Sequence, residues 1–194
     1  MLPNPNEKLD PRIVRTRGLI LKSFEDLLAE KGFETISVQD VTDKAQINRA
    51  TFYAHFEDKY ALLDHSIRQK FHQEIESRVL NACHYAPENL RMLILTVCEF
   101  QVKLNTSCAQ SQKQFAPLVE KQIKEQVYEL LLVWLRKMDI PISAEMPATA
   151  ATWAIYGLAS YWAASKNRPA LEAYVDKALP LVAVNLNQFA PEAP

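Results

Sequence analysis

The side chains best suited to bind a charged partner are basic and gather near the amino terminus. Between residues 8 and 22 the only carboxylate is Asp10, and the cations are Lys8, Arg12, Arg15, Arg17 and Lys22. Guanidinium and ammonium groups concentrated in so short a stretch attract phosphate oxygens, so this stretch predicts contact with nucleic acid. An ordinary solvated helix face is the alternative interpretation of the same charges.

The charge balance of the whole chain limits that prediction. The chain holds 22 Lys and Arg against 23 Asp and Glu, a formal charge of −1, so no broad positive field draws in a polyanion. Residues 1–59 carry nine basic against ten acidic residues, which leaves 13 of each for residues 60–194. Binding must therefore rest on a few placed contacts in the amino-terminal part, and the rest has a different task.

Other kinds of chemistry find little support. The sequence has no glycine-rich phosphate loop, no nucleophile elbow and no cluster of metal ligands, so we expect no enzyme, no cofactor and no metal. His65 and His72 are seven residues apart without a completing ligand. Cys83, Cys98 and Cys108 are an odd, unpatterned set, which predicts reduced thiols in the core; redox sensing by Cys98 or Cys108 is disfavoured because neither has a basic neighbour in sequence.

The elements that position the basic residues are predicted to be helices. The chain has only three glycines and little β-branched alternation, so hairpins have little sequence to form from. From Pro11 to Lys31 apolar residues recur at helical spacing, and Gly32 can end that helix in the left-handed conformation. The residues on this apolar face are Ile13, Ile20, Phe24, Leu27 and Leu28.

Two short helices and a long one follow. Ser37 with Asp40 three residues later forms a capping-box pattern that starts the first, and Asn48 is a good N-cap for the second. Helical spacing then predicts a long helix over residues 58–82. A long helix followed by two short helices around a tight turn lets the second short helix lie in the major groove of DNA.

Residues 12–63 resemble the DNA-binding domain of TetR-family regulators. The matching pieces are Lys31-Gly32-Phe33, the run from Thr51 to Phe56 (TFYAHF), and Lys59. The resemblance implies an all-α fold, with a three-helix helix-turn-helix DNA-binding domain over residues 1–57 and a helical effector-binding and dimerisation domain over residues 58–194. One departure is Gln46, where the family usually has glycine in the turn, so the turn is expected to use either a different backbone conformation or a strained left-handed one.

The resemblance also implies which residues contact DNA. Gln39 and Arg49 would face base edges, where Gln pairs with adenine and Arg with guanine. The residues at or near the phosphates would be Ser37, Thr51, Tyr53, His55 and Lys59, and Ala50 with Ala54 would narrow the base readout. Two alternatives stay open: Tyr53 as a half-buried core aromatic, and His55 as a helix-end residue favoured by the dipole.

Prolines mark the helices of the second domain. They predict helices from Pro87 to about residue 105 and from Pro117 to Met138, and two more starting near Pro147 and Pro169. Pro180 predicts a kink or break in the last one.

The last two helices carry more apolar residues than a small monomer needs, and, like those of the family, they are expected to form a homodimer. The residues are Ala150, Ala151, Ala154, Gly157, Leu158, Ala159, Tyr161, Leu171, Tyr174, Val175, Ala178, Leu181, Val182 and Leu186. An effector pocket is expected among the middle helices, with ordinary core packing as the alternative. Its candidate lining is Phe100, Leu104, Phe115, Tyr128, Leu131, Trp134, Trp153, Tyr156 and Trp162.

These patterns predict a ligand-responsive repressor that binds a palindromic operator in double-stranded DNA as a homodimer and responds to a small-molecule effector. Activation, constitutive DNA binding, an enzyme and a helical adaptor remain as alternatives. The first residues, MLPNPNEKLDPRIV, lack the features of a secretory signal, and no apolar run is long enough for a membrane span, so a cytoplasmic protein without membrane contact is expected.

Overall fold

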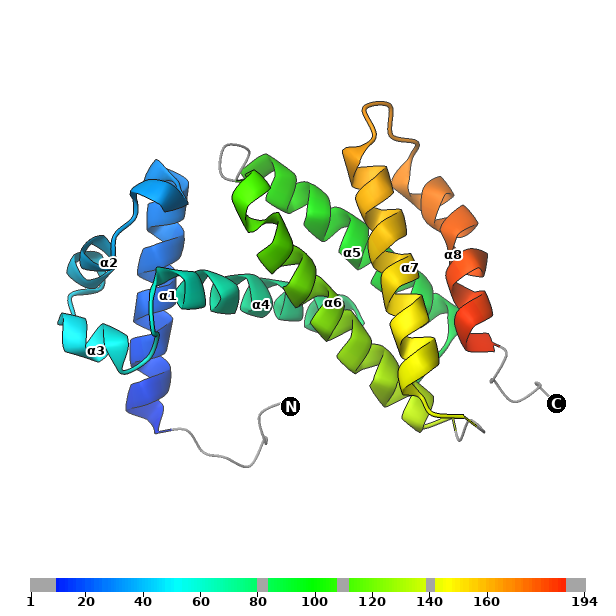
Figure 1. Cartoon of the computed structure of the whole chain (residues 1–194), viewed down its shortest axis with the longest axis horizontal. Helices are drawn as coiled ribbons and strands as arrows, with labels where there is room; N and C mark the ends of the chain where they lie inside the picture. Colours follow the sequence, from blue (N-terminus) through cyan, green and yellow to red (C-terminus); the bar gives the residue numbers. More distant parts are fainter. Residues whose placement is uncertain (1–9, 80–83, 108–111, 139–141, 188–194) are drawn as a thin grey trace. The chain divides into compact units, whose positions relative to one another are not determined.

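The computed structural model describes residues 10–79, 84–107, 112–138 and 142–187 (Figure 1). Within these ranges the chain forms eight α-helices and one short 3-10 helix, and no strand. This confirms the predicted all-α fold with an amino-terminal helix-turn-helix. None of the described helices combines the length and the apolar character that crossing a bilayer requires.

The chain divides into two compact units, Met1–Ser66 and Ile67–Pro194. The division falls within α4 (Lys59–Arg78), which ends four residues before the predicted limit of 82. The predicted domain limits, 1–57 and 58–194, assign all of α4 to the second domain and remain a prediction. The two units are described separately below.

The first unit is built on α1 (Pro11–Lys31), whose bounds are those predicted. The Asp10 carboxylate accepts a hydrogen bond of 2.9 Å from the backbone N–H of Arg12, and Pro11 occupies the first helical position, where no N–H is needed. Ile13 was predicted on the buried face but is 42% exposed, because the core begins about two turns later at Ile20. Gly32 has φ 72° and ψ 158°, so it ends α1 with positive φ but outside the predicted left-handed helical region.

Three short elements complete the helix-turn-helix. They are η1 (Phe33–Thr35), α2 (Val38–Ala45) and α3 (Arg49–Tyr53), with α2 packed against both α1 and α3. Their apolar faces and the start of α4 enclose one core, formed by Ile20, Phe24, Phe33, Val41, Phe52, Phe56, Leu62 and Leu63. Helix α2 thus packs on α1, and α3 packs on α2, around this apolar core.

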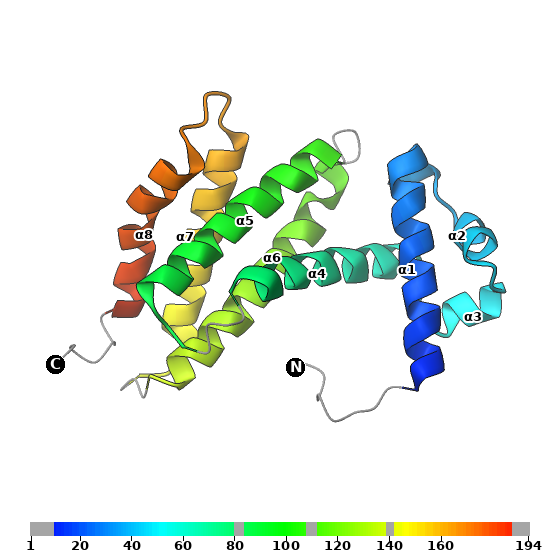
Figure 2. The same ribbon diagram turned by 180° about the vertical axis from the view of Figure 1, so that it is seen from behind.

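The second unit is a helical bundle completed by α5 (Pro87–Ser107), α6 (Gln112–Arg136), α7 (Glu145–Ala164) and α8 (Leu171–Asn187). Helix α7 packs against α5, α6 and α8, and α7 and α8 lie side by side from either direction (Figures 1 and 2). Pro117 lies inside α6 and does not start it, because the helix already begins at Gln112. Pro180 does not break α8, which continues to Asn187, so of the predicted kink or break only the kink remains a prediction.

The core of the second unit is apolar and aromatic. Phe71 of α4 and Phe100 of α5 have ring centroids 4.8 Å apart, and Trp134 of α6 is fully buried. Cys98 is also fully buried, and this burial raises the pKa of its thiol to about 12. Cys98 is therefore the small core residue that the sequence predicts, while Cys83 and Cys108 lie outside the described residues.

Candidate nucleic-acid interface

The start of α2 is fixed by a reciprocal cap. The backbone N–H of Asp40 donates to the Ser37 hydroxyl at 3.1 Å, and the backbone N–H of Ser37 donates to the Asp40 carboxylate at 2.7 Å. The hydrogen bonds from Ser37, with Lys31 at 2.9 Å, hold the pKa of the Asp40 carboxyl well below its usual value. The predicted capping box is confirmed, with Asp in the place where Glu is usual.

The turn between α2 and α3 adopts the left-handed alternative of the two that the sequence left open. Gln46 has φ 55° and ψ 44°, which is the left-handed helical region. Its N–H donates to the Asp43 carbonyl at 3.2 Å, and the next N–H, of Ile47, donates to the Thr42 carbonyl at 3.0 Å. This pair of bonds is the Schellman closure of a helix end, which glycine adopts at lower cost. The turn is therefore well formed but strained.

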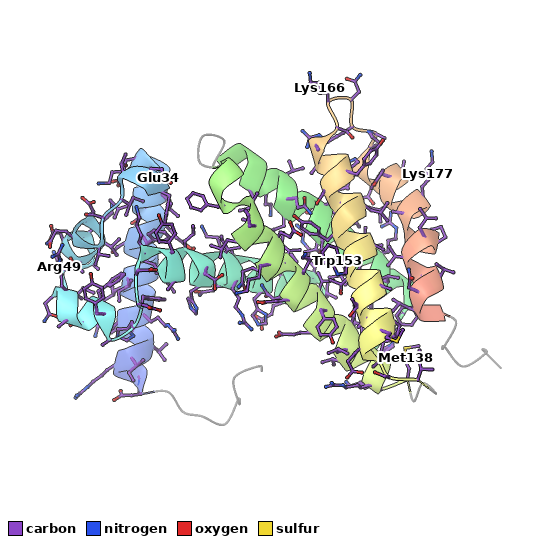
Figure 3. The ribbon with its side chains drawn as sticks, in the orientation of Figure 1. Glu34, Arg49, Met138, Trp153, Lys166 and Lys177 are labelled. Atoms are coloured by element: carbon purple, nitrogen blue, oxygen red, sulfur yellow. The ribbon has the colours of Figure 1, made fainter. Side chains whose placement is uncertain are left out.

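Helix α3 is short and starts on a side-chain cap. The Asn48 carboxamide oxygen accepts from the backbone N–H of Thr51 at 2.7 Å and from its hydroxyl at 2.8 Å, which confirms Asn48 as the N-cap. Arg49 and Ala50 follow at the exposed amino end of α3. Figure 3 shows Arg49 at the outer end of α3, next to the turn from α2. The Arg49 side chain thus projects from a helix end that the Asn48 cap fixes in the absence of DNA.

Most of the predicted contact residues lie on the surface of α2 and α3. Tyr53 is 54% exposed, and its ring lies nearly perpendicular to that of the buried Phe52, with 5.5 Å between centroids. Gln39 and Ser37 are exposed, and the Gln39 amide donates to Asp43 at 2.5 Å. Thr51 and His55 are half-buried. The structure brings Gln39, Arg49 and Tyr53 to one exposed helix pair.

Lys59 and Arg17 are engaged inside the first unit. The Lys59 ammonium donates to the backbone carbonyls of Phe33, Glu34 and Ile36 at 3.3, 3.3 and 2.9 Å. The Arg17 guanidinium carbon lies 5.3 Å from the ring centroid of Phe56. The sequence analysis missed both contacts, because their partners are more than twenty residues away along the chain.

The candidate pocket residues of the second unit do not share one environment. Phe100, Phe115, Leu131, Trp134 and Trp162 are buried, while Leu104, Tyr128 and Tyr156 are half-buried. Trp153 of α7 is 56% exposed, and the ammonium of Lys124 of α6 lies 3.5 Å from its ring centroid. Trp153 thus lies on the surface of the second unit. The described residues contain no group of three potential metal ligands.

Helix α7 carries an apolar stripe on its outer side. Met146, Trp153 and Tyr161 are 75%, 56% and 71% exposed, and the exposed small residues Ala150 and Gly157 lie between them at helical spacing. About half of the residues predicted for dimer contact lie instead in the unit's own core. These are Ala151, Ala159, Val175, Ala178, Val182 and Leu186.

Comparison with known proteins agrees with the geometry of the first unit. The family model described as bacterial regulatory proteins, tetR family, matches residues 20–65, a range that contains α2, α3 and the DNA contacts predicted from Ser37 to Lys59. An uncharacterized HTH-type transcriptional regulator of Bacillus subtilis, YxbF, is 43% identical over 72 residues, which is 35% of this chain and 19% of that protein. DhaS of Lactococcus lactis, the dhaKLM operon transcriptional activator, is 32% identical over 80 residues, 41% of each protein. The chain therefore spans less than half the length of each of these relatives.

Solved structures extend the likeness to the fold of nearly the whole chain. A TetR-family regulator of Streptomyces coelicolor has a TM-score of 0.58 at 14% identity, covering 92% of this chain and 98% of that one. A second, from Pectobacterium atrosepticum, has a TM-score of 0.57 at 16% identity, covering 96% and 100%. These relatives are transcriptional regulators and not enzymes. Residues 20–65 thus match the tetR family model in sequence, and nearly the whole chain is similar in fold to TetR-family regulators.

Proposed function

We propose that the protein is a DNA-binding transcriptional regulator that binds a palindromic operator as a homodimer. The observation that supports this most directly is the exposure of Gln39, Arg49 and Tyr53 on helices whose ends are already capped. Binding to DNA then needs little ordering of the backbone, and the side chains supply the contacts. The B. subtilis and L. lactis relatives are HTH-type transcriptional regulators.

The side chains divide into base readers and backbone contacts. Arg49 can donate two hydrogen bonds to guanine O6 and N7, and Gln39 can pair with adenine N6 and N7 once it leaves Asp43. The hydroxyls of Ser37 and Tyr53 suit phosphate oxygens, which set the register on the duplex. Thr51 and His55 lie next to this surface and complete the proposed contact set.

The proposed dimer forms through α7 and α8. Both helices expose large apolar side chains, among them Trp153 and Tyr161 on α7 and Leu181 and Val184 on α8. A Cβ at Gly157 would meet nothing within 4 Å in the protomer, so packing inside the protomer does not explain a glycine in the middle of α7. Close approach of a second copy does explain it, and a two-fold dimer matches a palindromic site.

The proposed effector is a small uncharged molecule that donates a hydrogen bond inside the second unit. The buried Gln126 amide donates from Nε2 to the Arg68 carbonyl at 3.1 Å, which fixes its orientation and leaves its carbonyl oxygen buried without a partner among the described residues. The buried Thr152 hydroxyl is in the same condition. A buried acceptor without a donor costs about 1 to 3 kcal/mol, which a ligand O–H or N–H would offset.

The surroundings favour a ligand without charge. No buried side chain described in this unit is ionised, so a charged ligand would lie there unpaired. RolR, a solved neighbour with a TM-score of 0.53 at 15% identity, has been crystallised with resorcinol, an uncharged hydroxylated ring. The effector would act by binding more tightly to the conformation that holds the operator less well, and the coupling cannot exceed that preference.

The effector prediction can be tested with phenol and its methyl ether, anisole. Phenol should raise the thermal midpoint of the wild-type protein more than anisole does, because only phenol can donate to the Gln126 oxygen. In Gln126→Met the two compounds should act alike. Equal effects in the wild-type protein would contradict the proposed hydrogen-bonding effector.

The operator prediction is tested by selecting bound fragments from random and genomic DNA at near-physiological salt. Recovery of a two-fold symmetric motif that Tyr53→Ala no longer holds, and that Lys166→Ala still holds, would support the proposal. Lys166 is a suitable control because it is exposed in the loop between α7 and α8 (Figure 3). Weak, sequence-independent binding that salt abolishes would contradict the proposal and favour a helical adaptor.

The direction of regulation is read from a reporter gene placed behind the selected operator. We propose repression, relieved by the effector. The L. lactis relative is an activator, so a domain of this sequence type also serves activation. A reporter that falls when the protein is expressed supports repression, and one that rises replaces it with activation.

A further inference from the structure

We propose that Lys59 fastens together the two ends of the DNA-reading segment and is a positioning residue, not a phosphate contact. This inference rests on the proposed DNA-binding function. The reading segment is defined here as residues 37–56, from the N-cap of α2 to the end of the α3 region. Ile36 precedes this segment and Lys59 follows it, so a bond between them closes the segment on itself.

The ammonium group of Lys59 uses all of its hydrogen-bond donors within the protein. A lysine ammonium has three N–H groups and no acceptor. Lys59 Nζ lies 2.9 Å from the carbonyl oxygen of Ile36 and 3.3 Å from those of Phe33 and Glu34. Each N–H therefore has a backbone carbonyl as its partner, and none remains for a phosphate oxygen.

The Lys59 ammonium also lies against the aromatic ring of Phe33. Lys59 Nζ lies 4.5 Å from the ring centroid of Phe33, a cation–π contact that holds the charge in place. Phe33 is itself fixed edge-on against Phe24 of α1 and against Tyr60 of α4, with centroid distances of 6.1 and 5.2 Å. The fastening point is thus anchored to the buried face of α1.

A comparison with the neighbouring lysines shows what is particular to Lys59. Lys31 pairs with the carboxylate of Asp40, and Lys44 pairs with the carboxylate of Glu30. Both of these partners are side chains on a surface, whereas the hydrogen-bond partners of Lys59 are backbone carbonyls in η1 and at the entry to α2. Its bonds therefore constrain the path of the main chain directly.

The consequence for DNA binding is geometric. The loop closed by the bond to Ile36 spans 23 residues and contains α2, the strained turn and α3. Without the bond, both ends of this loop gain freedom, and Gln39 and Arg49 lose their fixed separation. Sequence-specific binding needs that separation, while non-specific attraction to phosphate does not.

The test uses two substitutions at Lys59 and one at Arg49. The dissociation constants of Lys59→Met, Lys59→Arg and Arg49→Met are measured for the selected operator and for a random duplex over a series of salt concentrations. Each measurement is made at a temperature at which circular dichroism shows the variant fully folded. We expect Lys59→Met to lose about tenfold or more of its operator affinity and almost none of its random-duplex affinity.

The salt dependence and the arginine variant separate the two roles. If Lys59 positions the segment, the slope of log affinity against log salt stays as in the wild type. Lys59→Arg then fails to restore operator binding, because a planar guanidinium cannot aim N–H groups at three carbonyls around one point. If Lys59 contacts a phosphate, Lys59→Met lowers the slope by about 0.9, weakens both duplexes alike, and Arg restores binding, which would overturn the proposal. An unchanged operator preference in Lys59→Met would overturn it as well.

A second measurement needs no variant and so survives a folding failure. Reductive methylation of the wild-type protein with formaldehyde, followed by mass spectrometry, compares Lys59 with the exposed Lys166. Slow modification of Lys59 in the free protein, unchanged by operator, supports the proposal. Fast modification that operator suppresses would overturn it. If no operator can be selected at all, the proposed function fails, yet slow modification in the free protein still reports the fastening.

Discussion

The two units of this chain differ in which side chains they expose and in how their polar groups are paired. In the first unit the helix ends are capped by side chains and polar or aromatic side chains face outward, among them Arg49 and Tyr53. In the second unit an amide oxygen of Gln126 is buried without a partner and large apolar side chains such as Tyr161 face outward. The first unit leaves the Arg17 Nε buried without a partner among the described residues, whereas the second leaves several such atoms, among them the Gln126 oxygen and the Thr152 hydroxyl.

The comparisons with relatives divide along the same line. The match to the family model ends at residue 65, next to the end of the first unit at Ser66, while the likeness in fold extends over 92% of the chain. A unit that binds the same polymer needs particular side chains at particular places. A unit whose partners differ from protein to protein needs only a bundle that can hold them.

The largest effect that we expect concerns the apolar face of the second unit. Tyr161→Glu places a charge where the proposed partner copy packs, and an unpaired charge buried in an apolar contact costs several kcal/mol. The dimer should dissociate, and operator affinity should fall about 100-fold or more, while the protomer stays folded because Tyr161 is 71% exposed. Analytical ultracentrifugation and operator titration measure the two effects. A dimer that persists in Tyr161→Glu would place the interface elsewhere.

The next effect belongs to the reading helices. Arg49→Ala removes a bidentate partner for guanine, which is worth about 1 to 3 kcal/mol of discrimination, or roughly 10- to 100-fold in operator affinity. Fluorescence anisotropy with the selected operator and with single-base variants measures this loss. Lys166→Ala, which removes a cation far from these helices in sequence, is the control and should match the wild type. Equal losses in both variants would mean that Arg49 acts only through net charge.

The capping box should give the first unit a dependence on acid. The pKa of Asp40 is lowered from its reference value of 3.8 by the hydrogen bonds from Ser37 and by Lys31. Because the folded pKa is the lower one, this stabilisation is present above about pH 4 and is lost as the pH falls through the unfolded value toward the folded one. Asp40→Asn should therefore flatten the acid side of the stability curve.

Urea midpoints at pH 7 and pH 3 measure this difference. Asp26→Asn serves as the control, since Asp26 is exposed on α1, and should leave the pH dependence unchanged. A wild-type curve that is as flat as that of Asp40→Asn would show that the cap contributes nothing to it.

The smallest effect concerns the strained turn. Gln46→Gly should stabilise the protein by roughly 0.5 to 1 kcal/mol, because glycine adopts the left-handed conformation at φ 55° without a Cβ clash. The same substitution at Gln69, exposed within α4, should destabilise by about 1 kcal/mol. Urea unfolding compares the two variants. A Gln46→Gly protein that is less stable than the wild type would show that the turn is not strained.

Local signals explain most of what the sequence predicted correctly. The limits of α1, the cap at Ser37 and the cap at Asn48 all depend on residues within four or five positions of one another. Such signals can be found in sequence because the atoms that interact belong to neighbouring residues.

The errors have a common cause in contacts between distant elements. The periodicity of α7 and α8 shows that both helices are apolar, but it does not tell which side faces α5 and which faces outward, so Ala159 and Val182 were assigned to the surface. The carbonyl partners of Lys59 lie 23 to 26 residues away along the chain. Neither fact follows from spacing, because each depends on how separate helices pack.

The open space at Gly157 has a consequence for gene duplication. A methyl group added there would meet no atom of its own protomer within 4 Å, so Gly157→Ala leaves the protomer's fold free of new clashes. In the proposed dimer the same methyl group would stand against the partner's helix, and pairs with one or two such groups would differ in fit. When one of two gene copies acquires this substitution, pairing among its own products would weaken most, since both helices carry the methyl group, and the mixed pair would weaken less.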